Sequence, residues 1–127
     1  MNGNNFTNKA QDALMQAQQM AQEKGQQIDA LHLLLALLSQ EGSIITTILQ
    51  KLGVDGDALK KKVESQIARI PTILTPQAFG QFYLTQDMAK VLDRARQEAV
   101  KMNDEFISVE HLFLALLDTK SGAKELL

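Results

Sequence analysis

The stretch IDALHLLLALL, residues 28–38, returns as ISVEHLFLALL at residues 107–117. The segments that precede the two stretches also match: Thr7, Leu14, Ala17 and Ala21 recur as Thr85, Leu92, Ala95 and Ala99. The offset between the copies is one residue larger in the second helix of each pair, so the second copy has gained one loop residue. A duplication of this length predicts two helical hairpins on a shared core, with a seam where a groove can form.

A capping residue stands before each helical segment that the apolar spacing predicts. These residues are Thr7, Asp29, Ser43 and Asp55 in the first copy and Thr85, Ser108 and Ser121 in the second. No segment shows the alternation of a strand, and Pro71 and Pro76 mark an irregular connector. We therefore expect one all-α domain over residues 1–127, a pseudo-twofold bundle of two tandem helical repeats. Repeat one covers about residues 6–70, the connector 71–84 and repeat two 85–127.

Apolar residues at helical spacing predict which side of each helix faces the core. The helix after Asp29 has almost no polar side, which is typical of a buried helix. The predicted inward residues of the next helix are Ile44, Ile45, Ile48, Leu49 and Leu52, and those after Thr85 are Met88, Val91, Leu92, Ala95, Ala99 and Met102. In the repeat register, Leu126 and Leu127 match Ile48 and Leu49, which lie mid-helix. We therefore expect repeat two to be truncated, without its last helix, in a piece of a longer protein.

Composition excludes several function classes. The net charge of −2 argues against a nucleic-acid-binding protein, which needs a basic face, and the basic cluster Lys60–Lys62 is read as the solvated side of a helix. Cysteine is absent, so disulfides and thiolate metal sites are excluded. The apolar run Leu33–Leu38 is too short to span a bilayer, and the first residues do not resemble a signal peptide. These features favour a cytoplasmic protein that binds neither membrane nor nucleic acid.

The sequence offers little catalytic chemistry. Neither a phosphate-binding loop nor a nucleophile elbow is present. The two histidines, His32 and His111, occupy equivalent repeat positions, each three residues past a cap. A ring N–H there can meet a neighbouring backbone group, so we interpret both as structural rather than as a general base or a metal pair. We expect no catalytic residue, metal or cofactor in this chain.

The differences between the copies are more informative than the match. The extra loop residue falls in Asn103–Phe106, opposite Gln26 and Gln27 of the first copy. It places Asp104 and an aromatic near the second helix of repeat two, whose first turn carries Glu110. The connector contains Phe79, Phe82 and Tyr83. Exposed aromatics beside a seam would form an interaction site, but the connector can also fold back and cover the core with them.

Both hairpins resemble the Clp N-terminal repeat, which has a Phe-Thr-x-x-Ala start and an Ile-x-x-x-His-Leu-x-Leu-Ala-Leu-Leu helix. Here the start is Phe6–Ala10, and the helix motif occurs at Ile28–Leu38 and Ile107–Leu117. Among the branches of this family, the chain is most similar to the N-domain of ClpB, the AAA+ disaggregase. The residues that carry this likeness are Gly53-Val54-Asp55, Ile70-Pro71 and the run from Asp104 to His111.

The resemblance implies a mobile N-domain on a hexameric ATPase, which captures extended segments of unfolded or aggregated polypeptides and works with the DnaK system. ATP and magnesium would bind in AAA+ modules outside this chain. The family's substrate-contact positions fall on Thr7, Asp104 and Glu110, and Phe6, Phe82, Tyr83 and Phe106 are further candidates nearby.

Two alternatives remain open at this point. The chain could instead be the adaptor-docking N-domain of a protease-coupled ClpA- or ClpC-type unfoldase. A small enzyme that uses His32 or His111 is the more remote alternative, which burial of both rings would exclude.

Overall fold

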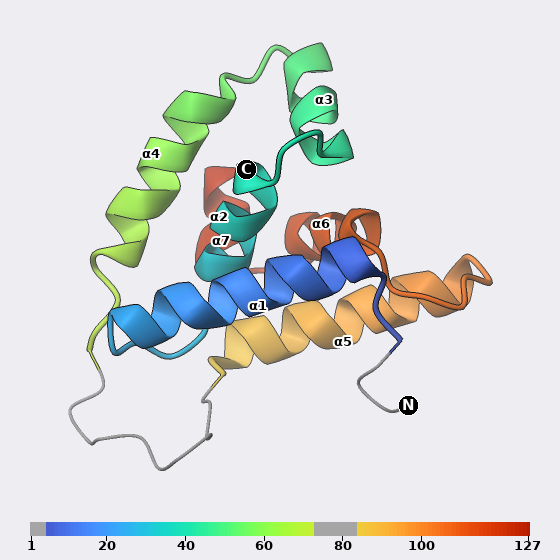
Figure 1. Ribbon diagram of the computed structural model, residues 1–127, viewed down its shortest axis with the longest axis horizontal. Helices are drawn as coiled ribbons and strands as arrows, with labels where there is room; N and C mark the ends of the chain where they lie inside the picture. The colour runs from blue at the N-terminus through green and yellow to red at the C-terminus, as the bar shows by residue number, and fades with distance from the viewer. Residues whose placement is uncertain (1–4, 73–83) are drawn as a thin grey trace.

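The fold is all-α, as the sequence predicts. The computed structural model describes residues 5–72 and 84–127, and this part of the chain forms seven helices (Figure 1). They are α1 (Asn8–Glu23), α2 (Ala30–Ser39), α3 (Ile44–Lys51), α4 (Gly56–Ile67), α5 (Gln86–Lys101), α6 (Val109–Asp118) and α7 (Gly122–Leu126). Most of the predicted connector, including Phe79, Phe82 and Tyr83, lies outside the described residues.

Each of the seven helices begins at the capping residue that the sequence predicts. The Thr7 side chain accepts a hydrogen bond from the Ala10 N–H, and Asp55 accepts from the two N–H groups that follow it in α4. These bonds satisfy backbone donors that have no partner within their own helix. Gly25 ends α1 with a φ of +62°, and Asn103 holds the equivalent position after α5 with a φ of +57°.

The helix α2 is the centre of the bundle, because it contacts each of the other helices in the described residues (Figure 1). This explains why its sequence has almost no polar side: eight of its ten residues are buried. Its counterpart α6 contacts α1, α2, α3, α5 and α7. The contacts also repeat between copies, since α1 packs on α6 as α5 packs on α2. The two repeats therefore interlock around the pair α2 and α6.

Two short parallel bridges bind one repeat to the other. Phe6, before α1, pairs with Ile107, before α6, and Leu84, before α5, pairs with Ile28, before α2. Each bridge joins the start of one hairpin to the loop of the other hairpin. The helices α1 and α6 therefore begin at one place, and α5 and α2 begin at another.

The predicted inward faces hold in most helices and fail at helix edges. In α3, Ile45 and Leu49 are buried, but Ile44 is 48% exposed and Leu52 is 71% exposed. Ile44 is turned about 100° around the helix from Ile45, away from the buried stripe, and Leu52 is the C-cap residue beyond the last turn of α3. Met102 is also 49% exposed, because it is the C-cap residue beyond the packed part of α5.

Candidate functional site

The structure brings the start of α1 beside the loop that carries the extra residue. The Thr7 N–H donates to the Ile107 carbonyl at 3.0 Å, and the Ile107 N–H donates to the Asn5 carbonyl at 2.6 Å. Ile107 lies midway between Asp104 and Glu110 in the sequence. We call this region, residues 5–7 with residues 104–111, the Thr7 junction. It contains all three of the predicted substrate-contact residues.

A related region forms at the other bridge. The Thr85 N–H donates to the Ile28 carbonyl at 3.0 Å, which is the counterpart of the bond from Thr7 to Ile107. We call residues 84–85 with residues 26–32 the Thr85 junction. The duplication thus supplies two versions of one local structure, and their side chains can be compared position by position.

Thr7 and Thr85 differ in the use of their hydroxyl hydrogens. Both side-chain oxygens accept the capping bond from the N–H three residues later. The Thr85 hydroxyl also donates to an Asp29 carboxylate oxygen at 2.6 Å. Ser108 replaces Asp29 in the second copy. Within residues 5–72 and 84–127 the Thr7 hydroxyl donates to no side chain, so it remains available as a donor at a half-buried surface position.

Asp104 is held at the start of the loop after α5. Its N–H donates to the Ala99 carbonyl at 2.9 Å, which matches the bond from the Gln26 N–H to the Ala21 carbonyl. Gln26 and Asp104 are therefore structural equivalents, and the extra residue of the second copy lies after Asp104. The side chain of Gln26 is buried in the molecule, whereas that of Asp104 is 49% exposed.

His111 contacts Asp104 directly. The His111 Nδ1 accepts a hydrogen bond from the Ser108 N–H at 2.8 Å, so the ring hydrogen lies on Nε2. That Nε2–H donates to an Asp104 carboxylate oxygen at 2.9 Å. The imidazole is buried while the carboxylate reaches solvent. The sequence analysis expected the ring N–H to bond to a neighbouring backbone group. In the structure the backbone N–H of Ser108 donates to the ring Nδ1, and the ring N–H donates to Asp104 instead.

His32 shows the same ring orientation with a different partner. Its Nδ1 accepts from the Asp29 N–H at 3.0 Å, and its Nε2 donates to the Gln26 side-chain oxygen at 2.9 Å. Burial lowers the pKa of His32 below 6.5, although the Asp29 carboxylate opposes this shift. Both rings are buried, which confirms the structural interpretation and argues against an enzyme that uses them. No cluster of possible metal ligands occurs in the described residues.

The remaining candidates divide between surface and core. Glu110 is exposed in the first turn of α6, where the partial positive charge of the helix N-terminus favours a carboxylate. Phe106 is 51% exposed and Phe6 is half-buried against the core. Phe82 and Tyr83 lie outside the described residues. The Thr7 junction thus combines a hydroxyl that donates to no side chain among the described residues, two exposed carboxylates and an aromatic. This set suits reversible binding and offers no activated nucleophile.

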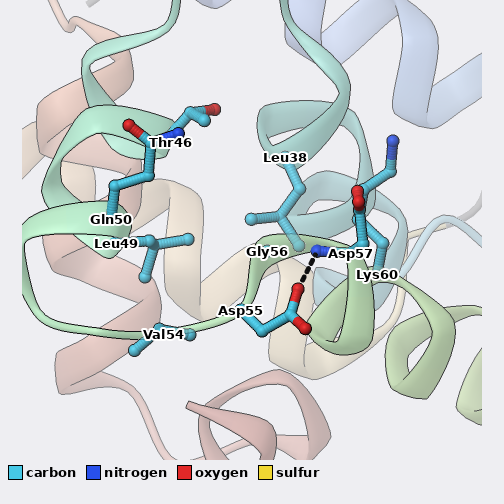
Figure 2. A pocket seen from close by; sticks show the side chains of 9 residues that line it. All are labelled: Leu38, Thr46, Leu49, Gln50, Val54, Asp55, Gly56, Asp57 and Lys60. Atoms are coloured by element: carbon cyan, nitrogen blue, oxygen red, sulfur yellow. Dashed lines mark hydrogen bonds between the residues drawn. The ribbon is translucent and has the colours of Figure 1, made fainter.

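A surface hollow of about 320 Å³ lies elsewhere, between the end of α2, α3 and the start of α4 (Figure 2). Its apolar part is formed by Leu38, Leu49 and Val54, and its charges are those of Asp55, Asp57 and Lys60. The Asp55 carboxylate is engaged in the N-cap of α4 (Figure 2). The hollow contains none of the predicted site residues, and its polar groups are those of an ordinary helix start.

Among the described helices, none is by itself long and apolar enough to cross a membrane, and only the sharply bent pair of α2 and α3 reaches that length and composition together.

Comparison with known proteins gives a family. Residues 5–127 match the Clp repeat (R) N-terminal domain. The chain is 40% identical to the chaperone protein ClpB of Bacillus cereus over 128 residues, which cover 99% of this chain and 15% of that protein. It is 38% identical to the chaperone protein ClpB of Bacteroides thetaiotaomicron, over 100% of this chain and 14% of that protein. The chain thus spans about 15% of the length of these curated relatives.

Solved structures show the same fold. The Hsp104 N-terminal domain from Candida albicans matches with a TM-score of 0.85 at 20% identity, covering 96% of this chain and 79% of that one. The N-terminal domain of the ClpV1 ATPase from E. coli matches with a TM-score of 0.78 at 24% identity, covering 97% of this chain and 71% of that one.

Proposed function

Because this chain belongs to the family of Clp repeat N-terminal domains, we propose that it is the substrate-recognition domain of a ClpB-type protein disaggregase. In this proposal it binds exposed or extended segments of unfolded and aggregated polypeptides. It then passes them to the AAA+ modules of a hexamer that hydrolyses ATP, in the cytoplasm and together with the DnaK system. The named ClpB relatives favour this role over the adaptor-docking role of ClpA- or ClpC-type N-domains.

The observation that carries the proposal is the difference between the two junctions. At the Thr85 junction the hydroxyl of Thr85 and the side chain of Gln26 form hydrogen bonds to other groups of the protein. At the Thr7 junction the Thr7 hydroxyl and the carboxylates of Asp104 and Glu110 face solvent at least in part. An extended polypeptide presents its own backbone N–H and C=O groups, which such donors and acceptors can bind without reading a sequence.

Weak binding is required for this role, because the domain must release each segment. A few surface hydrogen bonds each contribute only about 1 kcal/mol, since water competes for the same groups. The proposal therefore predicts micromolar or weaker dissociation constants. Phe106, exposed beside Asp104 in the loop, would add apolar contact with any segment that lies across the junction.

A binding assay tests the proposal. Fluorescence anisotropy of labelled lysozyme, kept unfolded by reduction and alkylation, is measured against the chain and a triple variant, T7A/D104A/E110A. We expect about a tenfold loss of affinity, because donor and acceptors are removed together. A control variant, T85A/E23A/E64A, removes one cap and two exposed carboxylates elsewhere and should bind as the parent chain does. Equal binding by the parent and T7A/D104A/E110A would refute the proposed function.

A further inference from the structure

The two histidines occupy equivalent positions and make equivalent backbone bonds, but their Nε2 partners differ. His32 donates to the neutral amide of Gln26, and His111 donates to the carboxylate of Asp104. Gln26 is turned inward, where its amide nitrogen donates to the carbonyls of Ile67 and Ile70 at 2.9 and 3.1 Å. The first histidine therefore helps to fasten the end of α4, and the second helps to fasten a surface carboxylate.

The orientation and the tautomer of the His111 ring are fixed by its neighbours. Its Nδ1 receives the Ser108 N–H, and Ser108 in turn accepts the N–H of residue 111, which is a reciprocal capping box at the start of α6. The α6 helix thus fixes the plane and the tautomer of the ring. Nε2 then carries the ring hydrogen, so it can form a hydrogen bond only as a donor. The Asp104 carboxylate oxygen, a charged acceptor, lies 2.9 Å from it.

The second carboxylate oxygen of Asp104, which does not contact His111, is the one that can accept a hydrogen bond from a ligand. Only one carboxylate oxygen meets His111, and the second accepts no hydrogen bond from another side chain in the part of the chain that the structure describes. A surface aspartate in a loop ordinarily loses rotamer freedom when it binds a ligand. The bond to His111 already restricts the Asp104 side chain before any ligand binds. Ligand binding therefore costs less side-chain entropy.

We propose that His111 is a positioning residue, which holds the Asp104 carboxylate in the orientation that accepts a backbone or side-chain N–H of the bound polypeptide. This inference rests on the proposed function, because it assigns a role within the same site. The binding surface in this view is preorganised by the helix start of α6 rather than by contacts with the ligand.

A double-mutant cycle tests this role with the same unfolded lysozyme probe. H111M removes the ring's bond to Asp104 with an uncharged side chain of similar length, and H32M, which removes the equivalent ring and capping bond from the Thr85 junction, is the matched control and should bind as the parent chain does. We expect H111M and D104A each to weaken binding about fivefold. The double variant should bind no more weakly than D104A alone, because His111 acts through Asp104. Independent effects, which multiply to about 25-fold, would overturn the inference.

Nitrogen-15 NMR of the imidazole supplies a readout that folding stability alone would not change. In the parent chain and in the control E105Q, we expect a protonated Nε2 whose hydrogen exchanges slowly with water, and an unprotonated Nδ1. D104A should speed exchange of the Nε2 hydrogen, and an unchanged exchange rate in D104A would contradict the proposal. If T7A/D104A/E110A loses binding while H111M binds as the parent does, the positioning role is wrong and the proposed function stands.

Discussion

The Thr85 junction and the Thr7 junction are built from the same repeat positions, but one is closed and the other is open. At the Thr85 junction every comparable polar side chain bonds within the protein: Thr85 to Asp29, His32 to Gln26, and Gln26 to the end of α4. At the Thr7 junction the backbone bridge is retained and His111 is buried. The side chains of Asp104 and Glu110 are exposed, and the Thr7 hydroxyl donates to no side chain among the described residues.

The substitutions behind this difference are small. Asp29 becomes Ser108, Gln26 becomes Asp104 and Leu31 becomes Glu110, and one residue is added to the loop. In the first copy these positions are buried, and in the second copy Asp104 and Glu110 are exposed. Both copies therefore keep the backbone bonds of the bridge, and at these positions the exposed carboxylates belong to the second copy.

The largest predicted effect concerns Gln26. Q26A removes the partner of two buried groups, the His32 Nε2–H and the Ile67 carbonyl, and of the partly buried Ile70 carbonyl. We expect the free energy of unfolding to fall by about 3 kcal/mol, because buried groups lose their hydrogen bonds without gaining water. The matched variant D104A should lower it by less than about 1 kcal/mol, since Asp104 is half exposed. Urea unfolding followed by circular dichroism measures both, and equal losses would contradict the comparison.

A smaller effect should follow from pH, through the buried ring of His32. Burial lowers the pKa of His32 below its unfolded value of 6.5, so below that pH the unfolded chain binds more protons than the folded chain. Stability is therefore complete above pH 6.5 and is lost progressively as the pH falls toward the folded pKa. Urea midpoints between pH 7.5 and 5.5 should show this slope in the parent chain and a much shallower slope in H32Q.

The sequence predicts helices better than it predicts contacts. Each helix start could be read from a Ser, Thr or Asp before an apolar periodic segment, because capping is a local interaction. The added loop residue was also visible, and with it the candidate role of Asp104. The two bridges that join the start of one repeat to the loop of the other could not be predicted. The pairing of Phe6 with Ile107, for example, depends on how distant segments of the chain pack.

The bond between His111 and Asp104 lies between these cases. The capping box from Ser108 to His111 has a recognisable spacing, but the partner of Nε2 depends on where the loop after α5 places residue 104. That place is set by the turn at Asn103, where a positive φ reverses the chain and directs the next N–H back to Ala99. The turn and the histidine bond both bear on Asp104, so they can be separated by experiment.

The smallest predicted effect separates them. Gly25 and Asn103 hold the same left-handed turn position, with φ values of +62° and +57°. N103G should raise the free energy of unfolding by about 0.5 kcal/mol, because glycine adopts this conformation without steric strain. G25N should lower it by about 1 kcal/mol, since a Cβ there would lie 3.1 Å from the Thr72 side chain.

If His111 rather than the turn residue orients the carboxylate, N103G binds unfolded lysozyme as the parent chain does. A loss of affinity in N103G as large as that in H111M would instead assign the orientation of Asp104 to the turn.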